Sequence, residues 1–505
     1  MRDWLSHRAV VSPDATALIT ADSSTSTDMR AETETTNTRA SVTYSALNET
    51  VDQVAARLAT LGVGHGSHVG LLMSNRPEAV WLIHATMRLG AVVVPLSTEQ
   101  TLSELAPRVE RADLDLLVCE RETEPIAVDC SVPVSSVDDG NVSLMDSPTA
   151  DESAADPEWK PTDPLVMLYT SGTTGQPKLV VLTVRNVFTS AVASADRLGV
   201  LPTDRWCSPL ALHHMGGIAP VYRAVIDGTG LILAPTDPKP LLNALSQHEA
   251  TGVSIVPVLL ERLLSVGTLP DSLRVVLLGG APASNELIEH CGDRGVPLHP
   301  TYGMTEAASQ IATARPSEAT ANPGTVGRPL FMTTVTIIDD DGYPLPPNER
   351  GEIVVSGPTI MKQYYRDSKA TGDAFCAHGF RTGDIGYLDE DDRLWVDGRA
   401  GDRIVTGGKT VDPSEVANVL CDHPEIADAA VVGLPDAEWG ECVGALLEQT
   451  DQDSSVDAAT IESYCRARLA SHKLPRVVTF GAIPRTESGT IDREVVRARL
   501  DVART

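Results

Sequence analysis

A ten-residue string at residues 169–178 carries the densest chemistry of the chain, and it reads Tyr-Thr-Ser-Gly-Thr-Thr-Gly-Gln-Pro-Lys. Its hydroxyls and backbone N–H groups are donors for anionic oxygens, and its glycines let a phosphate approach the backbone. Lys178 adds a mobile positive charge suited to the outer phosphates of a nucleotide. Because the lysine follows a proline and no Gly-Lys-Ser/Thr triplet closes the loop, the string is not a Walker motif. We therefore predict a phosphate-binding loop made of Thr170, Ser171, Gly172, Thr173, Thr174, Gly175 and Lys178.

Further strings follow in order along the chain. Together with the phosphate loop they resemble the core motifs of the adenylate-forming superfamily, which includes acyl-CoA synthetases, luciferases and the adenylation domains of peptide synthetases. The resemblance covers essentially the whole chain, and it implies ATP and Mg²⁺ as ligands, with coenzyme A as the co-substrate of the CoA-ligase branch. The strings are Gly279-Gly280-Ala281, Tyr302-Gly303-Met304-Thr305-Glu306, Arg381-Thr382-Gly383-Asp384, Gly398-Arg399 through Asp402, and Gly407-Gly408-Lys409 with Asp412 to Val416.

The resemblance implies roles in nucleotide binding for several of these residues. The ring of Tyr302 would stack on adenine, Thr305 would contact the α-phosphate, and Glu306 would hold Mg²⁺. Asp384 would bind both ribose hydroxyls. The catalytic residues would then be Thr305, Glu306 and Lys178, and the nucleotide would also contact Gly280, Ala281, Gly303 and Arg399.

The last strings imply a moving part. Asp402 stands at the family's hinge, about which a small C-terminal domain rotates between two half-reactions. Gly407, Gly408 and Trp439 fall in segments that the family brings toward CoA. Two steps are needed because a carboxylate is a poor electrophile. Attack on the α-phosphate of ATP gives an acyl adenylate, from which a thiol can displace AMP.

The stretch at residues 212–228 is informative about the acid. It closely resembles the o-succinylbenzoate–CoA ligases of the menaquinone pathway, which implies that Arg223 recognises the aromatic carboxylate while the aliphatic carboxylate is activated. A guanidinium suits this task because it can bind a planar carboxylate in a bidentate way. A purely structural alternative pairs Arg223 with Asp227, one turn further along the same helix. We expect His214 and Met304 to contact the acyl substrate as well.

Three positions depart from the family pattern. Leu179 stands where the phosphate loop usually continues with glycine, and Val184 stands where a histidine is frequent. The C-terminal motif Thr-x-x-Gly-Lys ends here in Thr490, so the lysine that bridges the substrate carboxylate and the α-phosphate is missing. This leaves open a nucleotide-binding pseudoenzyme without efficient adenylation. The pocket sequence also leaves open a ligase for another acid, such as a benzoate or a fatty acid.

The elements that must position these residues alternate between helix and strand. Apolar residues at spacings of four and three predict a helix over residues 47–61, and residues 69–95 read as strand, helix and strand. The same alternation returns over residues 230–278, and it predicts parallel sheets with ligands beyond the carboxyl ends of the strands. We therefore expect an α/β fold. A large N-terminal domain of parallel-rich sheets flanked by helices would span residues 1–397 and bind AMP and the acyl group, and a small mobile α+β domain would span residues 398–505.

The composition is that of a globular and strongly acidic protein. Its 69 acidic and 40 basic residues give a net charge of −29, which argues against nucleic acid or an anionic membrane as a partner. Only 7 of the basic residues are lysines. An acidic, lysine-poor surface is typical of proteins that work in concentrated salt, because salt screens the repulsion among carboxylates. An ordinary acidic enzyme from a GC-rich genome is the alternative.

The sequence also bears on the compartment. No apolar run approaches the ~18–20 residues that a membrane helix needs, and the N-terminus lacks the layout of a signal peptide. The 8 cysteines show neither metal-ligand nor redox spacing. We expect a cytoplasmic enzyme whose partners are a small carboxylic acid, ATP and CoA. The sequence gives no indication of the oligomeric state.

Overall fold

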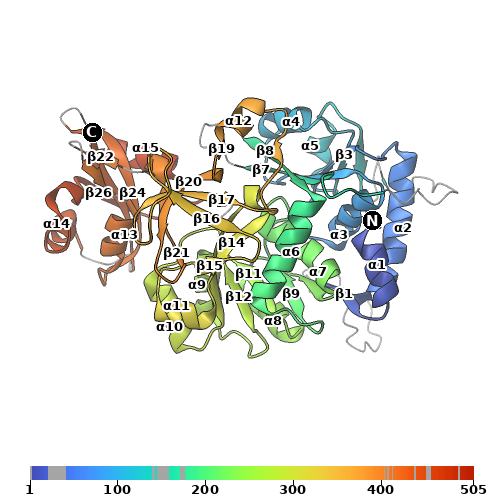
Figure 1. Cartoon of the computed structure of the whole chain (residues 1–505), viewed down its shortest axis with the longest axis horizontal. Coiled ribbons are helices and arrows are strands. Elements are labelled where there is room, and N and C mark those ends of the chain that lie inside the picture. Colours follow the sequence, from blue (N-terminus) through green and yellow to red (C-terminus); the bar gives the residue numbers. More distant parts are fainter. Residues whose placement is uncertain are drawn as a thin grey trace, which may run out of the picture.

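A computed structural model describes residues 3–20, 41–138, 143–144, 158–170, 177–402, 404–406, 409–411, 413–436, 439–450, 456–486 and 490–504. These residues form a large lobe and a small lobe (Figure 1). The small lobe, coloured orange to red, contains the last hundred residues or so and joins the large lobe near β20 and β21. The α/β class and the division into a large and a small part, both predicted from the sequence, are confirmed.

The first sheet of the large lobe has seven strands in the order β18-β8-β7-β4-β3-β5-β6. Strands β7, β4, β3, β5 and β6 run parallel to their neighbours, whereas β8 and β18 are antiparallel additions at one edge. The strands are β3 (His68–Leu72), β4 (Val92–Pro95), β5 (Leu116–Cys119), β6 (Val134–Ser136), β7 (Pro164–Thr170), β8 (Lys178–Thr183) and β18 (Gln363–Tyr364).

The second sheet has nine strands in the order β15-β14-β13-β12-β11-β9-β10-β1-β2. Its centre is parallel and its two edges are antiparallel. The strands are β1 (Thr16–Thr20), β2 (Ser41–Thr43), β9 (Arg205–Ser208), β10 (Gly230–Leu233), β11 (Gly252–Ile255), β12 (Val275–Leu278), β13 (Leu298–Met304), β14 (Ser309–Thr313) and β15 (Arg328–Pro329).

Helices cover both faces of these two sheets. The largest hydrophobic core contains residues of both sheets and of five helices, so these helices lie between the sheets: α1 (Trp4–Val11), α2 (Tyr44–Thr60), α3 (Pro77–Arg88), α6 (Val184–Leu198) and α7 (Met215–Asp227). A second core packs the outer face of the nine-stranded sheet against α8 (Pro238–Gln247), α9 (Pro257–Val266), α10 (Asn285–Asp293) and α11 (Pro316–Ala321). A third core packs the outer face of the seven-stranded sheet against α4 (Leu102–Arg111) and α5 (Glu124–Ala127).

The local predictions agree with these elements. The helix expected over residues 47–61 is α2, whose apolar residues Leu47, Val51, Val54 and Leu58 are all buried. The strand, helix and strand expected over residues 69–95 are β3, α3 and β4. Helix α2 begins where the side chain of Thr43 accepts a hydrogen bond from the backbone N–H of Ala46.

A third sheet in the large lobe is antiparallel and was not predicted. Its strands order as β16-β17-β20-β19, with β21 paired to the other part of β20. No helix separates β16 from β17 or β20 from β21, so the alternation that predicted parallel sheets is absent here. The elements are β16 (Thr334–Ile338), β17 (Gly351–Ser356), α12 (Ser368–Asp373), β19 (Phe375–Cys376), β20 (Gly379–Leu388) and β21 (Leu394–Arg399).

The small lobe has its own sheet and its own hydrophobic cores. Its strands order as β23-β22-β25-β24, and β26 pairs with β25. The buried residues of its two cores all fall between Ile404 and Leu500. The elements are η2 (Ala400–Asp402), β22 (Ile404–Thr406), β23 (Lys409–Val411), α13 (Pro413–Cys421), β24 (Ile426–Asp436), β25 (Gly440–Gln449), α14 (Ala458–Arg466), η3 (Ser471–Lys473), β26 (Val477–Phe480) and α15 (Arg493–Arg504).

Two further expectations concern membranes and thiols. Among the described residues, no helix combines the length and the apolar character needed to cross a bilayer. All eight cysteines are free thiols, and six of them are buried.

Candidate active site

The first and second sheets of the large lobe come together at a lysine, a glutamate and a tyrosine. Lys178 is the first residue of β8, Glu306 lies in the short helix η1 (Thr305–Ala307) directly after β13, and Tyr364 ends β18. The Tyr364 hydroxyl donates a hydrogen bond of 2.9 Å to Oε1 of Glu306. Nζ of Lys178 lies over the Tyr364 ring, 4.8 Å from its centroid. The structure thus brings together a lysine and a glutamate that are 128 residues apart (306 minus 178).

The third sheet supplies the next group of residues. Asp384 in β20 accepts a hydrogen bond of 2.5 Å from the hydroxyl of Tyr302, which belongs to β13. Nε of Arg399, on the neighbouring strand β21, lies 3.3 Å from Oδ1 of the same carboxylate. Burial raises the pKa of Asp384, Glu306 and Asp402 add to this effect, and Arg399 and Tyr302 oppose it. The predicted adenine and ribose residues therefore lie side by side, as one nucleoside requires.

The phosphate loop is described only at its two ends. Thr170 at the end of β7 pairs with Lys178 at the start of β8, so the predicted loop connects two adjacent antiparallel strands. Leu179 and Val184, two of the departures from the family pattern, are buried in hydrophobic cores. Five predicted contacts lie outside the described residues: Ser171, Gly172, Thr173, Thr174 and Gly175.

The glycines of the other nucleotide strings have structural reasons to be glycine. Gly280 follows β12 at the carboxyl edge of the sheet with φ +82°, a left-handed conformation that favours glycine, and Ala281 comes next. A Cβ at Gly303 would lie 1.9 Å from the carbonyl oxygen of Ser309 on β14. Met304 and Thr305 follow directly, at the end of β13 and the start of η1. These residues therefore lie at the strand edge where parallel sheets bind ligands.

The acyl side of the site centres on Arg223. This residue is buried in α7, its Nη2 donates a hydrogen bond of 3.1 Å to Oγ of Ser309, and its Nε has no hydrogen-bond partner among the described residues. Asp227, one turn further along α7, is the acid whose charge acts on Arg223, as the structural alternative expects. Burial lowers the pKa of Arg223 to about 10, an effect that Asp227 opposes. His214 caps the start of α7, with its ring 4.2 Å from that of His213.

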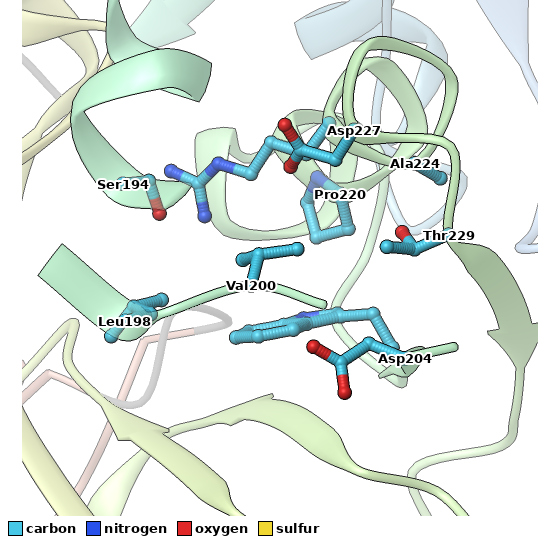
Figure 2. A pocket seen from close by; sticks show the side chains of 10 residues that line it. Ser194, Leu198, Val200, Asp204, Pro220, Ala224, Asp227 and Thr229 are labelled. Atoms are coloured by element: carbon cyan, nitrogen blue, oxygen red, sulfur yellow. The ribbon is translucent and has the colours of Figure 1, made fainter. Parts of the chain in front are cut away.

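A cavity adjoins Arg223 and lies between α6 and α7. Figure 2 shows Pro220, Ala224 and Asp227 of α7 on one side of it and Ser194 and Leu198 of α6 on the other. Burial raises the pKa of the Asp227 carboxyl to about 6, and Arg223 and Arg8 oppose this shift. The cavity has room for about one water molecule, and Asp204 and Thr229, which line it, directly precede β9 and β10. It therefore lies at the amino ends of these strands, away from the edge that carries the nucleotide strings.

The hinge and CoA residues lie in the small lobe or beside it. Asp402 in η2 forms an ion pair with Arg493, the first residue of α15, with Nε 3.3 Å from Oδ2. Trp439 is 39% exposed, and the guanidinium of Arg476 lies 4.9 Å from its ring centroid. Gly407 and Gly408, both predicted to contact CoA, lie outside the described residues.

The donor set at Glu306 fits magnesium bound together with ATP. Mg²⁺ prefers oxygen ligands, and it is usually held by one or two carboxylates plus phosphate oxygens and water. Glu306 supplies one such carboxylate next to Lys178, and no cluster of three or more His, Cys, Asp or Glu suited to a metal occurs in the described part of the chain. The remaining ligands would therefore come from the nucleotide and solvent.

Two residues of the site were missed from the sequence. Tyr364 contacts both Lys178 and Glu306, and Ser309 contacts Arg223. Ser309 lies three residues after the predicted string that ends at Glu306, so extending that string would have found it. Tyr364 is the first of two adjacent tyrosines and belongs to none of the predicted strings, so no pattern in the sequence indicated it.

Comparison with known proteins gives one consistent result. A 2-succinylbenzoate–CoA ligase of Bacillus licheniformis is 36% identical over 97% of this chain and 98% of its own length. Among solved structures, the o-succinylbenzoate CoA synthetase of Bacillus subtilis in complex with the acyl-adenylate intermediate is 33% identical, covers 98% of both chains and superposes with a TM-score of 0.89. The same enzyme in complex with ATP and magnesium ion covers 99% of both chains, at 33% identity and a TM-score of 0.85.

The family matches span both lobes. The AMP-binding enzyme family matches residues 5–365, and the C-terminal domain of AMP-binding enzymes matches residues 415–490. The first match includes the Lys178, Tyr302 and Glu306 strings. On these matches, and on a relative 36% identical over nearly the whole length, the chain belongs to the AMP-binding enzyme family.

Proposed function

We propose that this protein is an ATP-dependent o-succinylbenzoate–CoA ligase that acts through an acyl adenylate, in menaquinone biosynthesis. The observation that carries the choice of acid is Arg223, a buried cation whose Nη2 lies beside Ser309 at the end of the nucleotide string. The relatives that cover the whole chain at 33–36% identity bear the same activity in their names.

The geometry supports the following course of reaction. The aliphatic carboxylate of the substrate attacks the α-phosphate of ATP, the bond to the β-phosphate breaks, and pyrophosphate leaves. The sulfur of CoA then attacks the acyl carbon, and AMP leaves. Mg²⁺, when bound with ATP, neutralises phosphate charge. Lys178 would bind the outer phosphates, Thr305 the α-phosphate, Tyr302 adenine and Asp384 the ribose. The protein contributes mainly by positioning these groups and neutralising charge.

A panel of acids tests the proposed substrate. Purified protein with ATP, Mg²⁺ and CoA should convert o-succinylbenzoate to its thioester faster than benzoate or octanoate, with AMP and pyrophosphate as co-products. Equal or faster turnover of a monocarboxylic acid would overturn the choice of acid. Binding of ATP without release of pyrophosphate for any acid would instead favour the pseudoenzyme.

Replacing Arg223 with alanine should raise the KM for o-succinylbenzoate about 10- to 150-fold. A hydrogen bond to a charged group contributes about 1.5–3 kcal/mol, and each 1.4 kcal/mol corresponds to about tenfold in affinity. The KM for ATP should hardly change, because the hydrogen bond of Arg223 goes to Ser309 and not to a residue predicted to contact the nucleotide. Steady-state kinetics with each substrate varied in turn would measure both constants.

Two comparisons separate recognition from folding for Arg223. Arg223→Lys keeps the charge but loses the planar fork, so it should recover only part of the affinity. The matched control is Arg294→Ala, which replaces an exposed arginine of the large lobe and should leave both KM values unchanged. If Arg223→Ala raised the KM for benzoate as much as the KM for o-succinylbenzoate, Arg223 would have a structural role.

We also propose where the two domains meet and where the protein works. The boundary between residues 397 and 398 falls within β21, two residues before the strand ends at Arg399, so the end of this strand would belong to the connection. The cytoplasm is the proposed compartment, where ATP and CoA are available.

A further proposal is adaptation to high salt, for which the net charge of −29 and the 7 lysines are the support. The structure adds carboxylates that face one another between the lobes. Burial raises the pKa of Glu261 in α9, Asp428 of β24 and Glu286 of α10 add to this shift, and Arg485 opposes it. Such like charges repel less when salt screens them.

The melting temperature should accordingly rise between low and molar potassium chloride. For a chain of 505 residues, a gain of roughly 2 kcal/mol would raise it by about 2 °C. Differential scanning fluorimetry across a salt series measures this, with choline chloride at equal ionic strength to separate screening from specific ion binding. A melting temperature independent of salt would contradict the adaptation and favour the ordinary acidic enzyme.

A further inference from the structure

The segment before α12 connects the lysine and the glutamate of the site. The backbone N–H of Met361 donates a hydrogen bond of 2.7 Å to the carbonyl oxygen of Glu306. Three residues on, β18 pairs with β8, and Tyr364 lies opposite Val180, two residues from Lys178. The backbone of this segment is therefore fixed at both ends, to η1 on one side and to the phosphate hairpin on the other.

The side chain of Tyr364 makes the same connection a second time. Its hydroxyl donates to Oε1 of Glu306 at 2.9 Å, and its ring centroid lies 4.8 Å from Nζ of Lys178. Tyr364 is only 4% exposed, so its ring has little freedom to turn away. One buried side chain thus contacts both the predicted metal-binding carboxylate and the predicted phosphate-binding ammonium.

Each contact has a defined physical effect. An ammonium within about 6 Å of an aromatic centroid is attracted to the ring face, which limits where Lys178 can point. A hydroxyl that donates to one carboxylate oxygen fixes the orientation of Glu306 and leaves the other oxygen for a cation. Burial keeps the phenol protonated by raising its pKa well above the ordinary value, and the Glu306 charge acts in the same direction. Tyr364 therefore remains a donor throughout the usual pH range.

We propose that Tyr364 is a positioning residue, which holds the Glu306 carboxylate and the Lys178 ammonium at a fixed separation before Mg²⁺ and ATP arrive. This inference rests on the proposed function only for the identity of the nucleotide and the metal, not for the acid. Lys178 lies over the face of the ring, whereas Glu306 accepts from the hydroxyl at its edge, so different parts of one side chain hold the two charges. This arrangement would keep Lys178 available for phosphate oxygens and Glu306 for the metal.

Two substitutions divide the role into its parts. Tyr364→Phe removes the hydroxyl and keeps the ring, so only the orientation of Glu306 is lost. Tyr364→Leu removes the ring as well, so the placement of Lys178 is also lost. Tyr365→Phe is the matched control, because the Tyr365 hydroxyl donates at 2.9 Å to a carboxylate outside the site, that of Asp113.

Calorimetric binding of a non-hydrolysable ATP analogue, with and without Mg²⁺, gives a readout that needs no turnover. Tyr364→Phe should weaken binding about tenfold in the presence of Mg²⁺ and leave binding without Mg²⁺ unchanged. Tyr364→Leu should weaken both, and Tyr365→Phe neither. The rate of adenylate formation should follow the same order, whereas CoA capture of preformed adenylate should change little. Thermal unfolding of each variant shows whether it is folded.

Two results would overturn the proposal. Tyr364→Phe could match the Tyr365→Phe control in every measurement, in which case the hydroxyl orients nothing. It could also weaken binding equally with and without Mg²⁺, in which case Tyr364 only supports the fold. Because the binding measurement contains no acid, the proposal can hold even if o-succinylbenzoate proves not to be the substrate.

Discussion

Replacing Glu306 with glutamine should slow adenylate formation by about 10²–10³-fold, the loss expected when one preorganised electrostatic contact is removed from a reaction centre. The substitution is nearly isosteric, and the amide oxygen can still accept the hydrogen bond of 2.9 Å from Tyr364. What changes is the charge, and a neutral amide is a weaker ligand for Mg²⁺ than a carboxylate. Release of pyrophosphate, measured while Mg²⁺ is titrated, should show both a lower rate and a higher Mg²⁺ requirement.

The half-reactions provide the control for this result. CoA capture of preformed adenylate releases no pyrophosphate, so Glu306→Gln should affect it far less. Glu289→Gln removes one charge from an exposed site on α10 and should change neither half-reaction. Equal losses in both half-reactions, with an unchanged Mg²⁺ requirement, would show that Glu306 supports the fold and does not bind the metal.

Thr490→Lys should increase the rate of adenylate formation, by up to about 10²-fold. The lysine would restore a positive charge between the attacking carboxylate and the α-phosphate. Thr490 lies beside Thr486: its carbonyl oxygen accepts a hydrogen bond of 2.8 Å from the N–H of Thr486, and the two hydroxyls lie 2.7 Å apart. Arg493, a candidate substitute for the missing lysine, has its Nε at Asp402 of the hinge.

Adenylate formation and CoA capture are again measured separately for Thr490→Lys. CoA capture should be unaffected by Thr490→Lys, because the family rotates this loop away before the thioester forms. Ala467→Lys adds the same charge at an exposed position of the small lobe and should change neither step. An unchanged adenylation rate would indicate that Lys178 or Lys409 already supplies the charge. Selective damage to CoA capture would show that Thr490 does not act in adenylation.

The parts of the fold that were predictable are those with a local cause. Helix α2 follows from apolar residues such as Leu47 and Leu58 on one face, and the β3-α3-β4 unit follows from short apolar runs separated by a helical one. The antiparallel third sheet was missed because β16 and β17, and likewise β20 and β21, follow one another without a helix between them, so the alternation that indicates parallel strands is absent.

The site residues, too, separate into those that a local string indicates and those that only a distant partner explains. Lys178, Tyr302, Glu306 and Asp384 lie in strings whose resemblance to the family's motifs implies roles at phosphate, base, metal and ribose. Their convergence is confirmed by contacts such as the hydrogen bond from Tyr302 to Asp384. Tyr364 was missed because its hydrogen bond to Glu306 spans 58 residues, and no residue next to Tyr364 in the sequence indicates that contact.

The close approach of β13 and β14 at Gly303 bears on how natural selection acts on this stretch. Gly303 leaves no room for a Cβ, since that atom would lie 1.9 Å from the carbonyl oxygen of Ser309. Its neighbour Tyr302 contacts Asp384 and Glu306 contacts Tyr364, so their side chains serve the site. Two separate selective pressures thus act on one short string: backbone packing at Gly303 and side-chain contacts at Tyr302 and Glu306. A descendant that lost its catalytic role would be free to vary Tyr302 and Glu306, yet it would have to retain Gly303 for as long as it folded.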